Sequence, residues 1–166
     1  MSSEMSTMAS VSVVIPVYNE ELGIAPLLAR LLEVMKASDL DYEIIVVDDG
    51  STDDTTARIE TTGVHVLRHP ENRGYGAALK TGIRQASNPL IAIMDADGTY
   101  SPERIPYLVK YLVTSRCDMV VGARTGKGVK IPRLRRPAKW VINRLAELVA
   151  GQSIEDLNSG LRVFRR

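Results

Sequence analysis

Hydrophobic residues occur in short runs that alternate with segments of helical periodicity along most of the chain. The runs are rich in β-branched residues, which is typical of strands buried on both faces of a sheet. Between the runs, leucines and other apolar residues recur at spacings of three and four, which predicts helices that pack through one side. The pattern predicts strands at 11–15, 42–47, 64–67, 90–94, 119–121 and 161–164, and helices at 20–37, 53–60, 74–86, 102–115 and 138–150.

This alternation predicts an α/β fold, with a mostly parallel sheet covered by helices on both faces. Pro16 is expected to end the first strand, because proline cannot donate to a sheet ladder. Residues 1–10 are polar and small, so we expect a disordered tail followed by one domain over 11–166. They lack the pattern of a secretion signal, and no run reaches the roughly 18 apolar residues of a membrane span. A soluble chain is therefore the expectation.

Composition adds an asymmetry of charge. Hydrophobic residues make up 45% of the chain and charged residues 25%, which is ordinary for a globular domain, and the single Cys117 excludes a disulfide framework. Residues 1–116 carry 10 Lys or Arg and 16 Asp or Glu, whereas residues 117–166 carry 11 and 4. The basic excess is concentrated in 124–144, a segment without acidic residues. We expect this segment to face an anionic partner, with a solvated loop as the alternative.

Polar side chains follow three of the predicted strands where each strand ends. Residues 16–20 follow the first strand, Asp48 and Asp49 the second, and Asp95 and Asp97 the fourth. In an open α/β sheet these strand ends meet at one edge, where ligands bind. Two carboxylates one residue apart suit Mg²⁺, which commonly uses one or two protein carboxylates together with substrate phosphates. The alternative is that these acids only cap the turns and helices that follow.

Two common phosphate-binding patterns are missing. No run of three spaced glycines follows the first strand, and the glycines of 74–76 follow the third strand, the wrong context for dinucleotide binding. The glycines and cations of 122–127 lead into a stretch broken by proline instead of a helix. His65 and His69 have no Cys or Glu at ligand spacing and are expected to be structural. Redox and phosphate-loop chemistry are therefore disfavoured.

Four short motifs together resemble those of family 2 glycosyltransferases with the GT-A fold, from about residue 11 to the end of the chain. The motifs are Pro-Val-Tyr-Asn-Glu (16–20), Val-Asp-Asp-Gly-Ser (47–51), Asn-Arg-Gly-Tyr-Gly (72–76) and Asp-Ala-Asp-Gly (95–98). Within the family, the chain is most similar to the polyprenyl-phosphate (dolichyl-phosphate type) sugar transferases, because residues 156–162 resemble their Asp-x-x-Ser-Gly element. The resemblance implies inverting transfer of a hexose from a GDP- or UDP-sugar to a polyprenyl phosphate.

The resemblance also implies a nucleotide pocket and a metal site. The residues implied for the pocket are Pro16, Tyr18, Glu20, Asp48, Asp95 and Ala96. Asp48 would accept a hydrogen bond from the base, and Asp95 and Asp97 would hold Mg²⁺ or Mn²⁺ against the diphosphate. Thr99 stands where relatives of the dolichyl type often have a metal-ligating glutamine, so water or a hydroxyl would complete the coordination.

Cationic side chains are expected to assist the reaction. Negative charge builds on the leaving diphosphate, where a divalent cation stabilises it. Arg124 and either Arg135 or Arg136 could add to this stabilisation or hold an anionic acceptor. A lipid phosphate needs no general base because it is already anionic. A hydroxyl acceptor would need one, and Glu155 or Asp156 lies in about the right region of the chain.

The basic segment 124–144 and the resemblance together indicate a cytoplasmic protein that lies peripherally at the cytosolic face of a membrane. Nucleic acid is not expected, because Trp140 is the only aromatic residue in that segment. The alternatives are transfer to a saccharide or lipid hydroxyl, a non-catalytic nucleotide-sugar binding module, and a metal-dependent nucleotidyltransferase. Family members continue past a strand such as 161–164. We therefore expect a fragment or a minimal form whose last strand lacks neighbours.

Overall fold

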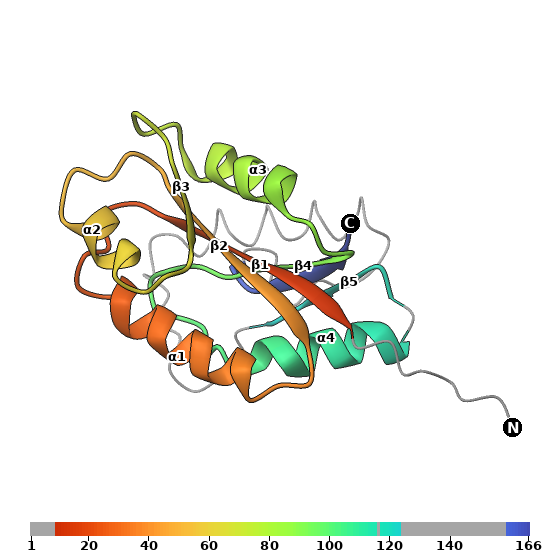
Figure 1. Ribbon diagram of the computed structural model, residues 1–166. Coiled ribbons are helices and arrows are strands. Elements are labelled where there is room, and N and C mark those ends of the chain that lie inside the picture. Colours follow the sequence, from red (N-terminus) through yellow and green to blue (C-terminus); the bar gives the residue numbers. More distant parts are fainter. Residues whose placement is uncertain (1–8, 116, 124–158) are drawn as a thin grey trace, which may run out of the picture.

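The computed structural model describes residues 9–115, 117–123 and 159–166, which form one sheet with helices on both sides (Figure 1). The strands are β1 (Ser10–Val17), β2 (Asp41–Asp48), β3 (His65–Arg68), β4 (Leu90–Ile93), β5 (Met119–Val121) and β6 (Arg162–Arg165). The helices in these ranges are α1 (Ile24–Lys36), α2 (Thr55–Glu60), α3 (Tyr75–Gln85) and α4 (Arg104–Ser115). All strands and helices predicted within these ranges are present, and the helix predicted at 138–150 lies outside them.

The strands follow the order β3-β2-β1-β4-β6-β5. β1 is parallel to both β2 and β4, and β2 is parallel to β3, so the predicted mostly parallel α/β sheet is confirmed. The prediction that the last strand lacks neighbours is wrong. β6 runs antiparallel between β4 and β5, and Val163 pairs with Ala92 on one side and with Val120 on the other.

Side chains of β1 alternate between the two faces of the sheet. Val13 and Ile15 belong to the larger apolar cluster, to which α1 and α4 contribute residues such as Leu28 and Leu112. Val14 belongs to the smaller cluster beneath α3. Figure 1 shows α1 and α4 on one side of the sheet and α3 on the other. The expected helical cover on both faces is therefore present.

The first strand is longer than predicted at both ends. It begins at Ser10, inside the segment expected to be a tail, and continues through Pro16 to Val17. The Val14 carbonyl accepts a hydrogen bond from Met94, so residues at even positions of β1 direct their backbone groups toward β4. Ladder pairing with β4 ends at Val14, so Pro16 lies beyond the paired residues, where a proline is tolerated.

A carboxylate ties two segments together near the amino-terminal ends of the strands. Glu43 Oε1 accepts hydrogen bonds from Ser12 Oγ at 2.5 Å and from the backbone N–H of Ser87 at 2.7 Å. Ser12 is fully buried on β1, and Ser87 lies in the connection between α3 and β4. Burial opposes ionisation of Glu43, but hydrogen bonds from Ser12, Ser87 and Asn88 outweigh it and hold its pKa below the ordinary value.

We expect the variant Glu43→Gln to be less sensitive to acid than the wild-type protein. A folded-state pKa below the ordinary 4.5 contributes stability above pH 4.5, and this contribution is lost as the pH falls through the lowered value. At neutral pH the variant should lose about 1 kcal/mol of unfolding free energy, the net contribution of one hydrogen bond. Denaturant unfolding near neutral pH and near pH about 3 checks this, with the exposed Glu60→Gln as control. Equal acid sensitivity of wild type and Glu43→Gln would contradict it.

Candidate functional site

The candidate site lies at the carboxyl edge of the sheet beside β1. β1 is the strand at which the order reverses, with β2 on one side and β4 on the other, and such a switch point opens a crevice between loops. The loops after β1 and β2 are tied together, since Asn19 N donates to Ser51 Oγ at 3.0 Å and Thr52 N donates to Asn19 Oδ1 at 2.9 Å. Asn19 adopts a positive φ of 53°, which asparagine tolerates better than most residues.

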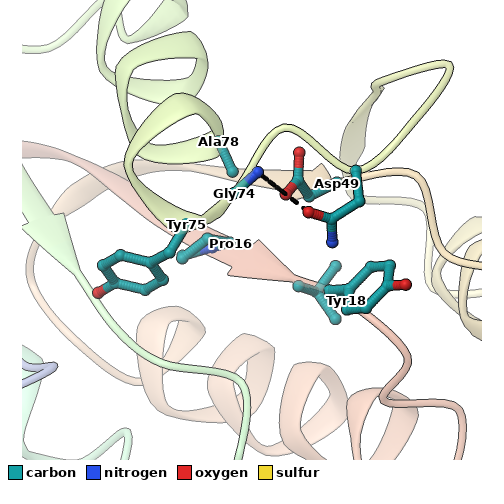
Figure 2. A pocket seen from close by; sticks show the side chains of 8 residues that line it. Pro16, Tyr18, Asp49, Gly74, Tyr75 and Ala78 are labelled. Atoms are coloured by element: carbon teal, nitrogen blue, oxygen red, sulfur yellow. Dashed lines mark hydrogen bonds between the residues drawn. The ribbon is translucent and has the colours of Figure 1, made fainter.

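A pocket of about 290 Å³ opens between the end of β1 and the start of α3 (Figure 2). In Figure 2, the rings of Tyr18 and Tyr75 lie to the two sides of Pro16. Pro16 and Tyr18 are thus on the pocket wall, where the sequence analysis expects nucleotide-binding residues. The residues that line the pocket are Pro16, Val17, Tyr18, Asp49, Asn72, Gly74, Tyr75 and Ala78.

Asp49 holds the loop that leads into α3. Its Oδ2 accepts a hydrogen bond from the backbone N–H of Gly74 at 2.7 Å, and its Oδ1 accepts one from the N–H of Arg73 at 3.0 Å. His69 Nδ1 lies 2.6 Å from the same Oδ1, and His69 Nε2 lies 2.9 Å from Thr81 Oγ1. Burial opposes ionisation of Asp49, but these hydrogen bonds lower its pKa below the ordinary value. His69 is buried and lies between Asp49 and Thr81.

Asp48, for which the resemblance implies a contact with the base, has no exposed surface. Its Oδ1 accepts a hydrogen bond from the Ser51 N–H at 2.9 Å, and its Oδ2 accepts one from the Thr56 hydroxyl. Arg68 Nε lies 3.7 Å from the same Oδ2. The structure therefore gives the pocket wall to Asp49 in place of Asp48. Through these hydrogen bonds, Asp48 connects the end of β2 to the turn at Ser51 and to α2.

Glu20 and Ala96 flank the start of α1 and are not among the residues that line the described pocket. The Glu20 N–H donates to Thr55 Oγ1 at 2.8 Å, which ties its loop to α2. A Cβ placed on Gly23 would lie 3.7 Å from Glu20 Oε2 and 3.9 Å from the Ala96 carbonyl oxygen. Glu20 and Ala96 belong to different loops, and both lie close to Gly23.

The two predicted metal ligands lie on the loop after β4. Asp95 is partly buried, whereas Asp97 is exposed and accepts a hydrogen bond from the Thr99 N–H at 2.9 Å. The Tyr75 hydroxyl donates to Asp95 Oδ1 at 2.8 Å. Burial, followed by this hydrogen bond and the charge of Asp95, raises the pKa of Tyr75, while the positive charge of Arg162 opposes the shift. Because Tyr75 also lines the pocket, its ring links the pocket to Asp95.

Gly160 lies against the other oxygen of Asp95. A Cβ placed on Gly160 would lie 1.6 Å from Asp95 Oδ2, so only glycine leaves room for the carboxylate. The Gly160 N–H donates to the Tyr100 hydroxyl at 2.7 Å, and Ser159 Oγ donates to the Gly122 carbonyl at 2.7 Å. Gly160, in the described part of the segment that resembles the Asp-x-x-Ser-Gly element, therefore packs directly on a predicted metal ligand.

Asp95 and Asp97 fit a divalent cation whose coordination is completed by water and by a bound substrate. Within the described residues, no group of three or more His, Cys, Asp or Glu could hold a metal ion. Asp95, which Tyr75 links to the pocket, and Asp97 on the same loop nevertheless match Mg²⁺, which keeps several waters and binds through one or two carboxylates and substrate phosphates. Five further candidates lie outside the described residues: Arg124, Arg135, Arg136, Glu155 and Asp156.

Asp49, Asn72 and Tyr75 line the pocket, but they received no role at the site in the sequence analysis. Asn72 and Tyr75 belong to the motif 72–76, which supported the resemblance without receiving a role of its own. Asp49 was noted only as the neighbour of Asp48. The signal for all three was their place within motifs. Their contacts depend on how α3 lies over β1, which no spacing along the chain reveals.

Comparison with known proteins identifies the family. The family model described as Glycosyl transferase family 2 matches residues 12–166. The chain belongs to this family. The predicted resemblance to family 2 is therefore confirmed.

Curated proteins of this family include close relatives. An undecaprenyl-phosphate 4-deoxy-4-formamido-L-arabinose transferase of Serratia proteamaculans (strain 568) is 37% identical over 170 residues, covering 99% of this chain and 51% of that protein. A dodecaprenyl-phosphate galacturonate synthase of Rhizobium johnstonii is 32% identical over 160 residues, covering 93% of this chain and 47% of that protein. The chain thus spans about half the length of these family 2 relatives.

Solved structures confirm the GT-A fold. Glucosyl-3-phosphoglycerate synthase from Mycobacterium tuberculosis, in complex with Mn²⁺, UDP-glucose and phosphoglyceric acid, matches with a TM-score of 0.74 and 25% identity, over 95% of this chain and 56% of that one. Mannosyl-3-phosphoglycerate synthase from Rubrobacter xylanophilus shares the fold with a TM-score of 0.78 and 21% identity, over 95% and 54%. Within the described residues, no helix has the length and apolar character needed to span a bilayer.

Proposed function

We propose that this family 2 chain transfers a hexose from a nucleotide-diphosphate sugar to a polyprenyl phosphate, by a single inverting displacement assisted by Mg²⁺ or Mn²⁺. The observation that carries this proposal is the junction of the pocket and the acidic loop. Tyr75 lines the pocket and hydrogen-bonds to Asp95, so a nucleoside in the pocket would direct its diphosphate toward Asp95 and Asp97. A related solved structure of this fold holds UDP-glucose and Mn²⁺ together.

In this proposal different residues bind the nucleoside and the cation. Pro16, Tyr18 and Asn72 would hold the nucleoside, whose base is uracil or guanine. Asp95 and Asp97 would bind the cation, which stabilises the negative charge that builds on the leaving diphosphate. Arg124 and Arg135, outside the described residues, would add positive charge near the phosphates. No general base is required for a lipid phosphate acceptor, because it is already anionic.

The acceptor is proposed from the curated relatives and from the charge of the chain. Both relatives described above are named for a polyprenyl phosphate. The segment 124–144 is basic and without acids, and each cation near an anionic membrane surface contributes about 1 kcal/mol of attraction. We therefore place the chain at the cytosolic membrane face, with the lipid and not a nucleic acid as its anionic partner.

Transfer to a hydroxyl is the second candidate, favoured by the similar solved structures. Those enzymes are named for glucosyl or mannosyl transfer to 3-phosphoglycerate, a small anionic acceptor. Such an acceptor would need a general base. Transfer of labelled sugar to undecaprenyl phosphate in vesicles, compared with transfer to phosphoglycerate, separates the two candidates.

Calorimetric titration of UDP and GDP, each with and without Mn²⁺, tests the donor site directly. We expect one nucleotide to bind more tightly with Mn²⁺, and we expect Asp97→Ala to reduce this metal-dependent gain at least about 10- to 100-fold. That range applies when a metal ligand loses only its outer hydrogen-bond partner, so the loss of a ligand should cost no less. Binding is measured because the chain spans about half the length of its relatives.

A matched control is Asp39→Ala, which removes an exposed aspartate from the connection between α1 and β2, at the other edge of the sheet. It should bind as the wild type does. If neither nucleotide binds the wild-type protein, or if Asp97→Ala keeps the full metal-dependent gain, the proposed site is wrong.

A further inference from the structure

We infer that Tyr75 is a positioning residue, whose hydroxyl orients the Asp95 carboxylate for the metal ion while its ring forms the wall of the nucleotide pocket. This inference rests on the proposed function, because it assigns to Asp95 the metal ion of the donor site. It adds a role for a residue of the motif 72–76 that neither the family match nor the relatives' names supply.

The hydroxyl reaches Asp95 from a different part of the fold. Tyr75 is the first residue of α3, whereas Asp95 lies on the loop after β4, twenty residues later in the chain. The ring of Tyr75 is about half exposed, and its hydroxyl donates to Asp95 Oδ1 at 2.8 Å. A carboxylate oxygen has two lone pairs, so Oδ1 can keep this hydrogen bond and still bind a cation.

The start of α3 is itself fixed in place. The Gly74 N–H donates to Asp49 Oδ2 at 2.7 Å, and Asp49 is 3% exposed and also accepts from Arg73 and His69. Tyr75 follows directly on this anchored residue. The backbone of Tyr75 is therefore restrained at the edge of the sheet, which holds the phenol near Asp95.

The two oxygens of Asp95 are constrained by different partners. Oδ1 accepts a hydrogen bond from the Tyr75 hydroxyl. Oδ2 packs against Gly160, so closely that a Cβ on Gly160 would lie only 1.6 Å from it. Contacts on both oxygens restrict rotation of the carboxylate, so less conformational entropy is lost when the cation binds. Removing an outer hydrogen-bond partner from a metal ligand typically lowers metal affinity 10- to 100-fold.

Tyr75→Phe separates this role from a simple contribution to the pocket wall. Phenylalanine keeps the aromatic surface that lines the pocket and removes only the hydroxyl. We expect Mn²⁺ affinity in the presence of the bound nucleotide to fall about 10- to 100-fold. Nucleotide affinity without metal should stay at the wild-type value. Mn²⁺ titration followed by electron paramagnetic resonance measures the first quantity, and calorimetry measures the second.

The matched control is Tyr111→Phe, which removes the hydroxyl of a tyrosine on α4 that is about half exposed. It should leave both affinities unchanged. Wild-type Mn²⁺ affinity in Tyr75→Phe would overturn the inference and leave the proposed function intact. An equal fall of nucleotide affinity with and without Mn²⁺ would also overturn it, since Tyr75 would then act only as a wall. Absence of Mn²⁺ binding to the wild-type protein would overturn the proposed function and the inference together.

Discussion

Replacing Gly160 by alanine is expected to abolish metal-dependent nucleotide binding in a protein that remains folded. The new Cβ would lie 1.6 Å from Asp95 Oδ2 and 2.1 Å from Asp95 Cγ, so one of the two residues must move. Gly160 is held by its bond to the Tyr100 hydroxyl, and the adjacent Leu161 carbonyl accepts from Gly122 N–H at 2.9 Å. The carboxylate of Asp95 is therefore the group that yields. Loss of only an outer hydrogen-bond partner already lowers metal affinity about 10- to 100-fold, so displacement of the ligand itself should cost more.

Mn²⁺-dependent nucleotide binding by calorimetry, with circular dichroism to confirm folding, measures this effect. Gly76→Ala is the matched control, because a Cβ placed on Gly76 in α3 meets nothing within 4 Å. A double-mutant cycle with Asp95→Ala tests the route of the effect. If Gly160 acts through Asp95, adding Gly160→Ala to Asp95→Ala should cause no further loss. Full binding by Gly160→Ala would show that the Asp95 carboxylate does not need its present position.

Replacing Gly50 by alanine is expected to lower the free energy of unfolding by about 2–5 kcal/mol. Gly50 has a φ of +73°, which costs other residues about 1–2 kcal/mol. Its Cβ would also lie 2.4 Å from the carbonyl carbon of Glu71 and 2.7 Å from the backbone nitrogen of Asn72. These are backbone atoms that cannot rotate away, and overpacking of this kind costs about 1–3 kcal/mol.

Gly63→Ala provides a matched control for the conformational part of this cost. Gly63 has a nearly equal φ of +72°, but a Cβ there meets nothing within 4 Å. It should lose only about 1–2 kcal/mol in denaturant unfolding. Gly50→Ala should also weaken nucleotide binding, since Asn72 lines the pocket. Equal destabilisation by both variants would contradict the prediction, because it would mean that the loop carrying Asn72 shifts to accommodate the Cβ at no cost in free energy.

Most elements of this fold could be predicted because each carries its own local signal. The buried runs of β1, β2 and β4 and the apolar stripes of α1 and α4 depend on neighbours that are close in sequence. The position of β6 has no such signal. Its pairing with β4 is a contact between residues about seventy positions apart, and nothing in the residues 162–165 specifies an antiparallel insertion.

Asp48 and Asp49 show that two neighbouring residues of one motif can lie in different surroundings. The second strand was predicted to end at residue 47, but β2 continues through Asp48. Successive side chains of a strand point to opposite faces, so Asp48 is directed into the fold and Asp49 reaches the pocket. The predicted metal pair is less sensitive to such a shift, because Asp95 and Asp97 lie two residues apart on the loop after β4.

The insertion of β6 divides the site between two distant parts of the chain. All residues that line the pocket precede β4, whereas the strand that joins β4 to β5 comes from residues 162–165. Gly160, immediately before β6, supplies the second constraint on Asp95. The pocket wall and the surroundings of Asp95 therefore depend on segments that are more than eighty residues apart, and only the sheet brings them together.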